Sequence, residues 1–447
     1  MPPFLRALRN RNYRLYVVGQ LVSLVGTWMQ TVAQNWLVYR LTGSPVQLGL
    51  IGFAGQIPVF LLSPIGGAVA DRFNRPRVLL CTQAGAGLLA LLLAVLTFTE
   101  RVEIWHVFTL ALLFGVVFAF DVPARHALIA EMVDKTDMTN AIALNSSMVN
   151  GARIIGPAIA GLTVAAIGEG WCFLVNAVSY LALIASLFAM RLTPPAQRAK
   201  DESALHSIVE GFQFVARTAP IRALLLMVAL SSVMGLPYTV LMPIFADQIL
   251  QGGAGGYGVL MATSGAGALI GALTLASRTN VRGLGTWVAV ATAAFGLSLI
   301  MFSISRVFWL SALLLVPVGY FLMVQLAASI TLIQAMVPNR LRGRVMAAYS
   351  MMFFGMSPFG ALLSGALAGP LGAPMTVALG GLACVLGSLV FGARLPALRA
   401  VGRQLIVAQE LAAGDPPAEV LTPGRDVQTD ESRPQALERE PPPIEHD

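Results

Sequence analysis

A single arginine stands deep inside one of the long apolar stretches of this sequence. Arg153 lies about 13 residues into a predicted helix at 140–167, roughly 20 Å from its start at 1.5 Å per residue. Apolar stretches of this length can cross a lipid bilayer, where a cation near the centre is costly and usually marks a functional site. We expect Arg153 to bind a ligand in a central cavity or, alternatively, to pin two helices together.

Amide side chains form the second polar group in the apolar stretches. They are Gln30, Gln34 and Asn35 in the first stretch, Gln56 in the second, Asn150 beside Arg153, and Gln325 in the tenth. Gln30 and Gln34 are four residues apart and therefore share one face of a helix. An amide-rich lining suits a neutral or amphipathic small molecule, so we predict that these residues and Arg153 line a substrate cavity. The alternative is that some of them serve helix–helix contacts.

Carboxylates are missing from the middle of every predicted span. The nearest are Asp71 and Asp121 towards one side of the membrane, and Asp247 towards the other. Proton-coupled membrane proteins often use an intramembrane carboxylate. The sequence therefore leaves the means of energy coupling open, with these three acids as candidates.

Motifs for other chemistry are absent from the sequence. There is no G-x-x-x-x-G-K-[ST] loop for ATP, no H-E-x-x-H and no G-x-S-x-G. Cys81, Cys172 and Cys384 have no metal-ligand spacing and, being three, form no disulfide framework. We expect neither an enzyme nor a bound cofactor or metal.

Composition places the chain among membrane proteins. Of its 447 residues, 56% are hydrophobic and 11% are charged, against about 25% charged residues in an average soluble domain. We predict an all-α membrane fold of twelve transmembrane helices, divided by Gly, Pro and charged residues. The predicted spans are 15–38, 46–70, 78–98, 105–124, 140–167, 171–190, 221–249, 257–277, 284–304, 307–335, 345–369 and 373–393.

Positive charges alternate between the loops. Twenty-two Lys and Arg residues fall on one side of the predicted membrane, and only Arg40, Arg101 and Arg306 fall on the other. Because positively charged loops face the cytoplasm, the number of spans must be even and both termini are expected inside. Topology explains these basic residues, so we expect no nucleic-acid partner.

The longest internal loop divides the spans into six and six. We predict an N-terminal cytoplasmic segment at 1–14, six-helix halves at 15–190 and 221–394, a cytoplasmic linker at 191–220, and a disordered tail rich in Pro and acid at 395–447. Within the linker, Ser203–Arg217 has apolar residues at helical spacing, which indicates an amphipathic helix on the membrane surface.

The two halves resemble repeats of one unit. Shifting 128–168 by 204 positions places it on 332–372 and aligns four pairs of glycines. These pairs are Gly151/Gly355, Gly156/Gly360, Gly161/Gly365 and Gly168/Gly372. Two parallel repeats around a central cytoplasmic loop are a known transporter plan, in which the substrate site lies between the halves near the membrane centre.

The segment that joins the second and third spans contains Gly67, Asp71, Arg72 and Arg75. This pattern resembles the G-x-x-x-D-R-x-x-R motif of the major facilitator superfamily, with Asn74 and Pro76 as departures. The resemblance implies the major facilitator fold of two pseudo-symmetric six-helix halves. It also implies a latch, in which Asp71 and the arginines pair with neighbouring helices and stabilise one conformation. The alternative is a basic loop that only sets the topology.

Asp121 and Arg125 lie at the predicted cytoplasmic end of the fourth span. The resemblance to the superfamily implies that Asp121 is a partner for the latch arginines. Alternatively, the two residues form a self-contained pair, because they are one helical turn apart.

The fifth span contains Gly151, Gly156, Pro157 and Gly161. The segment Gly156-Pro157-x-x-x-Gly161 is similar to the G-P-x-x-G-G signature of the superfamily's antiporters, with Ala160 in place of one glycine. Small residues let helices approach closely and proline bends a helix. The resemblance implies an exporter, and the alternative is ordinary helix packing.

Two further runs resemble one bacterial branch of the superfamily, which includes enterobactin and macrolide exporters. They are Asn10-Arg11-Asn12-Tyr13-Arg14-Leu15-Tyr16 and Pro338-Asn339-Arg340-Leu341-Arg342-Gly343-Arg344-Val345. The resemblance implies a monomer in the bacterial inner membrane that exports drugs or siderophores by alternating access, driven by protons. The competing hypotheses are a facilitator or importer of a small nutrient without proton coupling, and a membrane enzyme or receptor, for which no nucleophile–base set exists.

Overall fold

The computed structural model describes residues 3–134, 137–191, 204–278 and 283–413, except for the side chains at 3–5, 71, 139, 204–209 and 410–413. Within these ranges the chain is built from helices and has no strand. After η1 (Pro3–Arg9), the first group of helices is α1 (Arg11–Thr42), α2 (Pro45–Arg72), α3 (Arg75–Phe98), α4 (Ile104–Met132), α5 (Met138–Ile167) and α6 (Glu169–Ala189).

The second group follows α7 (Ala204–Arg217), which occupies the predicted linker. It consists of α8 (Ala219–Leu230), η2 (Ser231–Gly235), α9 (Tyr238–Ile244), η3 (Phe245–Ile249), α10 (Gly253–Ala276), α11 (Leu284–Ile304), α12 (Phe308–Met336), α13 (Arg342–Ser350), η4 (Met351–Gly355) and α14 (Ser357–Ala413). The short elements η2, η3 and η4 are π-helical turns.

Eleven segments of the described chain are long and apolar enough to cross a membrane. One of them, Ala219–Ile249, combines α8, η2, α9 and η3. Another, Arg342–Gln409, contains two helices that meet at Gly372, where φ is 80° and ψ is 158°. This conformation is open to glycine and ends one helix before the next begins. With that division the predicted fold of twelve transmembrane helices is confirmed.

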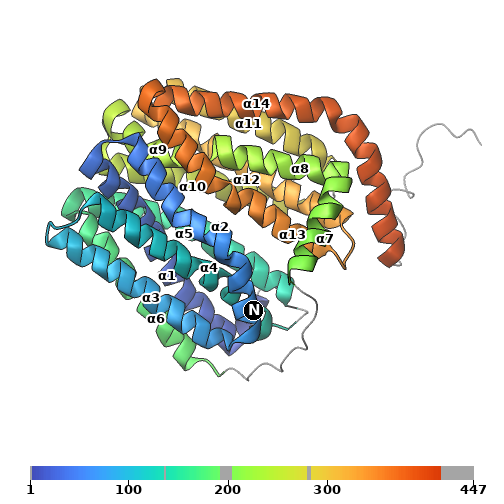
Figure 1. Cartoon of the computed structure of the whole chain (residues 1–447), viewed down its shortest axis with the longest axis horizontal. Coiled ribbons are helices and arrows are strands. Elements are labelled where there is room, and N and C mark those ends of the chain that lie inside the picture. Colours follow the sequence, from blue (N-terminus) through green and yellow to red (C-terminus); the bar gives the residue numbers. More distant parts are fainter. Residues whose placement is uncertain (1–2, 135–136, 192–203, 279–282, 414–447) are drawn as a thin grey trace, which may run out of the picture.

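The two groups of helices lie side by side (Figure 1). Helices α1–α6 fill the lower part of the view and α8–α14 fill the upper part, while α7 lies against α13 at one end. We call this end of the molecule the inner end. The opposite end contains the turns at Gly43, Gly168 and Gly372, and we call it the outer end, as the loop charges predict.

Equivalent glycines have equivalent roles in the two halves. Gly168 and Gly372 both have positive φ, 90° and 80°, and each ends the fifth long helix of its half. Gly156 packs α5 against α1, because a Cβ there would lie 2.5 Å from the Cβ of Trp28. Gly360 packs α14 against η2 in the same way, with the carbonyl oxygen of Val233 2.6 Å from its Cβ position.

A second pair of glycines joins the two halves to each other. A Cβ on Gly161 of α5 would lie 2.7 Å from the Cα of Gly258 in α10. A Cβ on Gly365 of α14 would lie 2.9 Å from the Cα of Gly49 in α2. These are backbone-to-backbone contacts, which only glycine permits. The pseudo-symmetry inferred from the repeat therefore appears in the packing.

Local capping explains where α3 begins and why the loop departs from the superfamily motif. The side chain of Asn74 caps α3 by accepting a hydrogen bond from the backbone N–H of Arg77 at 3.2 Å. Pro76 follows in the first turn, where its missing N–H has no helical partner to lose. Asn74 and Pro76, the two departures from the superfamily motif, therefore form the N-terminus of α3.

Two boundaries differ from the sequence prediction by more than two helical turns. Helix α4 continues to Met132, beyond the predicted end at residue 124, so Asp121 and Arg125 lie within the helix. The tail was predicted to be disordered from Leu395, but α14 continues to Ala413. Residues 414–447 lie outside the described residues. In this segment Leu395, Leu398, Leu405 and Ile406 pack against the core.

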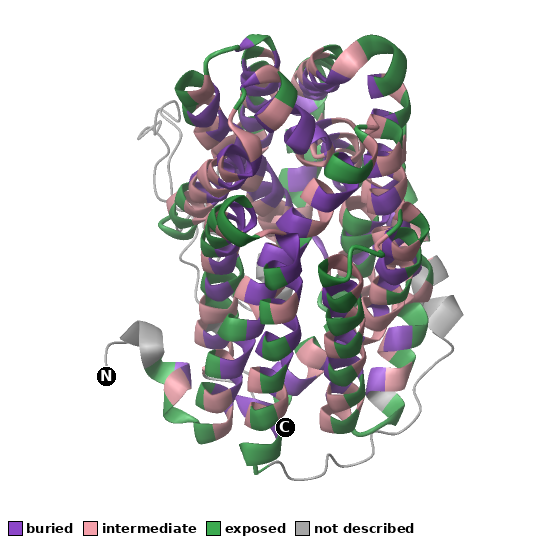
Figure 2. Ribbon diagram, turned by 90° about the vertical axis from the view of Figure 1, so that its left-hand side faces the viewer, coloured by how far each residue is buried: buried purple, intermediate pink, exposed green. Residues whose placement is uncertain are grey.

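Exposed apolar side chains cover the outside of the bundle. Figure 2 shows exposed residues along the outward faces of the helices, while buried residues concentrate between them. Leu162, Phe188 and Trp309 are all more than 70% exposed. An apolar outer surface of this extent marks contact with a membrane.

Candidate functional site

The glycine–proline segment of α5 lies where the two halves meet. Gly156 contacts α1 and Gly161 contacts α10, as described above, and the carbonyl oxygen of Pro157 also lies against Gly258. Gly151 differs, because a Cβ there would have no neighbour within 4 Å. Three of the four residues of the predicted antiporter motif therefore hold α5 between a helix of its own half and a helix of the other.

Arg153 lies one turn before Gly156, at the same junction. Its guanidinium carbon lies 5.7 Å from the centre of the Trp28 ring, which is a cation–π distance. Its carbonyl oxygen would lie 2.9 Å from a Cβ on Gly265 of α10. The side chain is half-buried, and within the described chain it forms no ion pair.

Tyr238 and Ser264 form a hydroxyl pair in the second half. The Tyr238 hydroxyl lies 2.6 Å from the Ser264 hydroxyl of α10. Tyr238 is 2% exposed, and it follows Pro237 at the break between η2 and α9. Ser264 precedes Gly265, which packs against the Arg153 carbonyl, so this hydroxyl pair lies beside the junction of α5 and α10.

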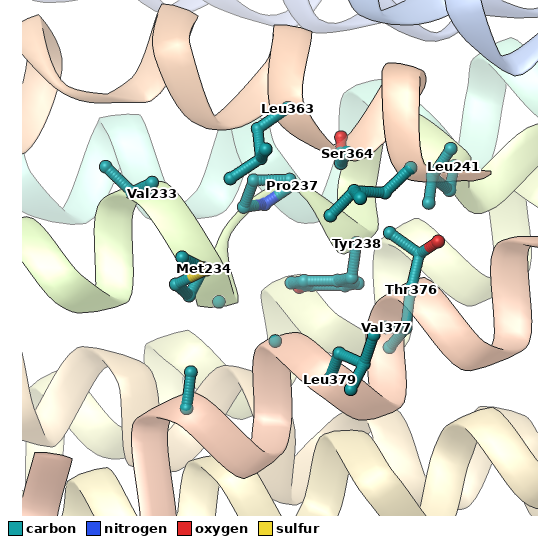
Figure 3. A pocket seen from close by; sticks show the side chains of 14 residues that line it. Val233, Met234, Pro237, Tyr238, Leu241, Leu363, Ser364, Thr376, Val377 and Leu379 are labelled. Atoms are coloured by element: carbon teal, nitrogen blue, oxygen red, sulfur yellow. The ribbon is translucent and has the colours of Figure 1, made fainter. Parts of the chain in front are cut away.

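The ring of Tyr238 also lines an apolar cavity of about 220 Å³ inside the second half. Figure 3 shows this cavity between the Val233–Leu241 segment and the two arms of α14 that carry Leu363 and Val377. Its polar side chains are already engaged, since the Thr376 hydroxyl donates to the Gly372 carbonyl at 2.9 Å.

The predicted amide lining divides into two groups. Gln30 is buried and accepts a hydrogen bond from Asn176 of α6 at 2.6 Å. Gln325 is fully buried, where it accepts from the Ser231 hydroxyl at 2.9 Å and donates to the Met227 carbonyl at 3.1 Å. Both amides bond within their own half.

The remaining amides are less enclosed. Asn35 donates to the hydroxyl of Tyr257, in the other half, at 3.4 Å. Asn150 donates to the Ser146 carbonyl of its own helix at 2.9 Å. Gln34 and Gln56 are half-buried. Of the predicted cavity residues, the structure therefore brings Arg153 and Asn35 into contact with the opposite half.

A polar contact that sequence reasoning missed closes the outer end. Tyr39 of α1 donates a hydrogen bond to Asp247 of η3 at 2.7 Å. Trp36 stacks on Tyr257 of α10 with ring centres 6.2 Å apart. The sequence shows that Trp36 and Tyr39 share a face of α1 with the nearby Asn35. It does not show their partners, which are more than 200 residues away along the chain.

Asp121 lies in a buried polar network within the first half. It is 2% exposed, accepts from Thr82 at 2.8 Å and from Gln83 at 2.7 Å, and pairs with Arg125 one turn along α4. Tyr16 of α1 is also fully buried. These partners of Asp121 lie on α3 and on α4 itself. None of them is Arg72 or Arg75, the predicted latch arginines.

The latch loop itself has a different acidic partner. Arg75 pairs with Glu131, near the end of α4, and also donates to the Ala70 carbonyl at 3.2 Å. Arg72 is exposed, and the side chain of Asp71 lies outside the described residues. The extension of α4 beyond its predicted end is what brings Glu131 to this loop.

Close packing in the latch region falls one residue before the motif glycine. A Cβ on Gly66 would lie 2.0 Å from the carbonyl oxygen of Ala119 in α4, whereas Gly67 has open space. On the second half, Glu210 of α7 pairs with Arg340 at 2.7 Å and with Arg344 of α13. The linker helix is thereby attached to the second half.

Twelve helices in two pseudo-symmetric halves, with a polar site at their junction, define a transporter of the major facilitator superfamily rather than an enzyme. The chain belongs to the transmembrane secretion effector family, whose model matches residues 4–413.

Curated relatives cover most of the chain. It is 27% identical to the Staphyloferrin A transporter of Staphylococcus aureus, over 85% of this chain and 95% of that protein. It is 26% identical to the enterobactin exporter EntS of Shigella boydii, over 86% and 90%. It is 27% identical to the multidrug efflux pump Tap of Mycolicibacterium fortuitum, over 79% and 88%.

Solved structures support the same fold. A bacterial homologue of the lysosomal transporter Spinster, in an inward-facing and unoccupied conformation, matches with a TM-score of 0.68 at 14% identity, over 92% of this chain and 99% of that one. A mutant of the nucleoside transporter NupG matches with a TM-score of 0.68 at 14% identity, over 86% and 99%.

Proposed function

We propose that this protein is a secondary active transporter that exports small amphipathic molecules by alternating access, coupled to protons. The observation that carries the proposal is the position of the glycine–proline segment of α5, which joins the halves on either side of Arg153. Relatives named as a siderophore transporter, a siderophore exporter and a multidrug efflux pump support export of drug-like or siderophore-like cargo.

Alternating access is supported by where the halves touch. The contacts described above, from Tyr39–Asp247 to Gly161–Gly258 and Gly49–Gly365, lie between the membrane centre and the outer end. We assign this arrangement to an inward-facing state, in which the outer end is closed. Release to the outside then requires these contacts to separate while the inner ends approach each other.

The latch loop is assigned to the opposite state. We place both termini and the loop at 67–77 in the cytoplasm of the bacterial inner membrane, following the loop charges. There Asp71, Arg72 and Arg75 are positioned to pair across the inner end when it closes. In the inward-facing state Arg75 rests on Glu131 of its own half.

Proton coupling is assigned to two acids. Asp121 is held by Arg125 inside the first half, and Asp247 is held by Tyr39 across the outer junction. Protonation of either carboxylate would weaken the contact that this carboxylate makes. The equilibrium between the two conformations then shifts by the difference in proton affinity that the carboxylate has in each of them.

Everted membrane vesicles test the direction of transport and its energy source together. Vesicles from cells that express the chain are energised to make their interior acidic and are offered a panel of structurally varied amphipathic compounds. We expect accumulation of some compounds that an uncoupler abolishes and that Asp121→Asn reduces to the level of vesicles without the protein. The exposed Arg101→Gln is the matched control and is expected to transport normally.

The alternative outcomes separate the competing functions. Accumulation that survives the uncoupler indicates a facilitator, and net flux in the opposite direction indicates an importer. If no compound of the panel accumulates in a gradient-dependent way, proton-coupled export is contradicted.

A further inference from the structure

Arg153 differs from three other arginines of the helices in having no acidic partner within the described chain. Arg125 pairs with Asp121, Arg75 with Glu131, and Arg40 with Glu169 at 2.7 Å. Arg153 lies in the middle of α5, where an unpaired cation is least favourable in a membrane. The sequence of this protein therefore supplies a counter-charge to each of these arginines except the most central one.

The elements around Arg153 cannot supply that counter-charge. Trp28 of α1 and Gly265 of α10 lie against Arg153 of α5, and Tyr238 of α9 bonds to Ser264, the neighbour of Gly265, at 2.6 Å. None of these four helices contains an Asp or a Glu. The polar groups that the second half carries next to Gly265 are hydroxyls, from Tyr238 and Ser264.

We propose that Arg153 is the binding site for an anionic group, and that the exported substrates are amphipathic acids. The inference rests on the proposed export function and names its substrate class. A carboxylate or a similar oxyanion would accept two N–H bonds from the planar guanidinium and would provide the charge that the helices lack. We assign the hydroxyl pair of Tyr238 and Ser264, beside Gly265 in the other half, as further donors to the same oxyanion.

The aromatic groups define the rest of the ligand. Trp28 lies at a cation–π distance from the guanidinium of Arg153. The ring of Tyr238 forms part of the wall of the apolar cavity. A flat or apolar body attached to the acid would gain contact with these rings. Because one contact group comes from each half, such a ligand would be held at the junction that alternating access opens and closes.

A binding assay with matched acids and esters tests the inference directly. The purified full chain is placed in phosphatidylcholine nanodiscs, and binding of 2-naphthoate, 4-phenylbutyrate and decanoate is compared with that of their methyl esters. We expect the wild type to bind at least one acid about tenfold or more tightly than its ester, and Arg153→Gln to lose this preference without weakening ester binding. Arg153→Lys is expected to keep part of the preference, because it keeps the charge without the planar fork.

Controls separate a ligand site from a structural pin and from a lipid site. Arg306→Gln removes an arginine at the outer end that bonds only to the Ser303 and Ser305 carbonyls at 3.0 and 3.1 Å, and it is expected to keep the acid preference. A ligand site predicts that Arg153→Gln without ligand melts at or above the wild-type temperature, whereas a pin predicts a lower one. If anionic phospholipid added to the nanodiscs competes with the acids in the wild type but not in Arg153→Gln, the anion site stands and its natural occupant is lipid, which overturns the substrate assignment.

Two results contradict the inference itself. They are the absence of acid preference in the wild type across all three pairs, and an unchanged preference in Arg153→Gln. Failure of the export proposal is distinguished by the vesicle assay, where gradient-driven accumulation of neutral or cationic compounds alone would leave export intact and remove only the acidic substrate class.

Discussion

The pair Asp121–Arg125 shows how a membrane-embedded half can hold two charges at the level of single residues. The carboxylate is almost completely buried, and its oxygens are occupied by Arg125, Thr82 and Gln83. A buried ion pair stabilises a protein little more than two apolar residues in the same place would. Removing one partner, however, leaves a buried charge without a counter-ion. Stability and coupling therefore depend on the same contact.

A double-mutant cycle measures this contact. We expect Asp121→Ala and Arg125→Ala each to lower the free energy of unfolding by roughly 3–5 kcal/mol, and the double variant to lose much less than their sum. The measurement is reversible unfolding in mixed detergent micelles. Arg6→Ala is the control, because the Arg6 side chain is exposed and its pair with Asp137 at 2.9 Å is expected to contribute about 0–1 kcal/mol. Single-variant losses no larger than that of Arg6→Ala would contradict the prediction.

At the residue scale, the sequence predicted positions better than partners. The depth of Arg153 followed from counting residues, because a helix rises by a fixed distance per residue. The cavity role of Gln30 and Gln325 could not be settled in this way, since periodicity gives the face of a helix and not the helix that covers it. Glu131 and Asp247 were not linked to Arg75 and Tyr39, because those pairings depend on how helices distant in sequence pack.

At the element scale, α5 acts as the helix shared by both halves. Its contacts with α1 and α10 are made through glycines, so the backbones approach to a distance at which any side chain would intrude. The equivalent contacts of α14 with η2 and α2 repeat this arrangement in the second half. These two helices are therefore the elements whose packing must change when the outer end opens.

Adding one methyl group to α5 tests that role. A Cβ at Gly161 meets the Gly258 Cα at 2.7 Å and the Ala254 carbonyl at 3.1 Å, and backbone atoms cannot rotate away. We expect Gly161→Ala to separate α5 from α10, to lower the stability of this state by about 1–3 kcal/mol, and to reduce transport in the vesicle assay. Gly151→Ala adds the same methyl group to open space on the same helix, and it is expected to fold and transport normally. Equal behaviour of the two variants would contradict a shared role for α5.

Helix existence and number were predictable from apolar length and loop charge, whereas two helix ends were not. The end of α4 was placed at residue 124, because charged residues were taken as the membrane boundary, although Asp121 and Arg125 neutralise each other and allow the helix to continue. The helical segment after Leu395 was hidden by the Pro-rich and acidic residues that follow it. Leu398, Leu405 and Ile406 pack against the core there, which is enough to order the segment.

At the scale of the whole molecule, the hydrogen bond from Tyr39 to Asp247 joins the halves at the outer end. Tyr39→Phe removes the bond to Asp247 and keeps the ring, which lies 5.5 Å from Trp36. A hydrogen bond to a charged group contributes about 1.5–3 kcal/mol, so we expect a shift towards states with the outer end open. Spin labels at exposed positions 101 and 251, in a variant without native cysteines, report this shift as a larger population of long distances.

A second tyrosine provides the matched control for that measurement. Tyr13 donates to the Ala141 carbonyl at 2.8 Å entirely within the first half. Tyr13→Phe is therefore expected to lower stability without changing the distance distribution. If Tyr39→Phe also leaves the distances unchanged, the Tyr39–Asp247 contact does not hold the outer end closed.

A disulfide between the two halves near the outer end tests whether that end must open during transport. A Cβ on Gly52 of α2 would lie 3.1 Å from the Cβ of Ala361 in α14, and its next neighbour is Val240 at 3.7 Å. Disulfides join Cβ atoms about 3.5–4.5 Å apart, so a small relaxation allows Gly52→Cys and Ala361→Cys to bond across the two halves. Cys81, Cys172 and Cys384 are first replaced, since all three are free thiols.

We expect oxidation of this double variant to stop transport in vesicles and reductant to restore it, while each single variant transports under both conditions. The physical reason is that a disulfide fixes α2 to α14 in the closed arrangement, and release to the outside requires those helices to separate. Mass spectrometry of the oxidised protein establishes that the bond has formed. Undiminished transport by a fully bonded protein would mean that cargo leaves by a route that does not separate the halves, and alternating access by rocking of two rigid halves would then be wrong for this protein.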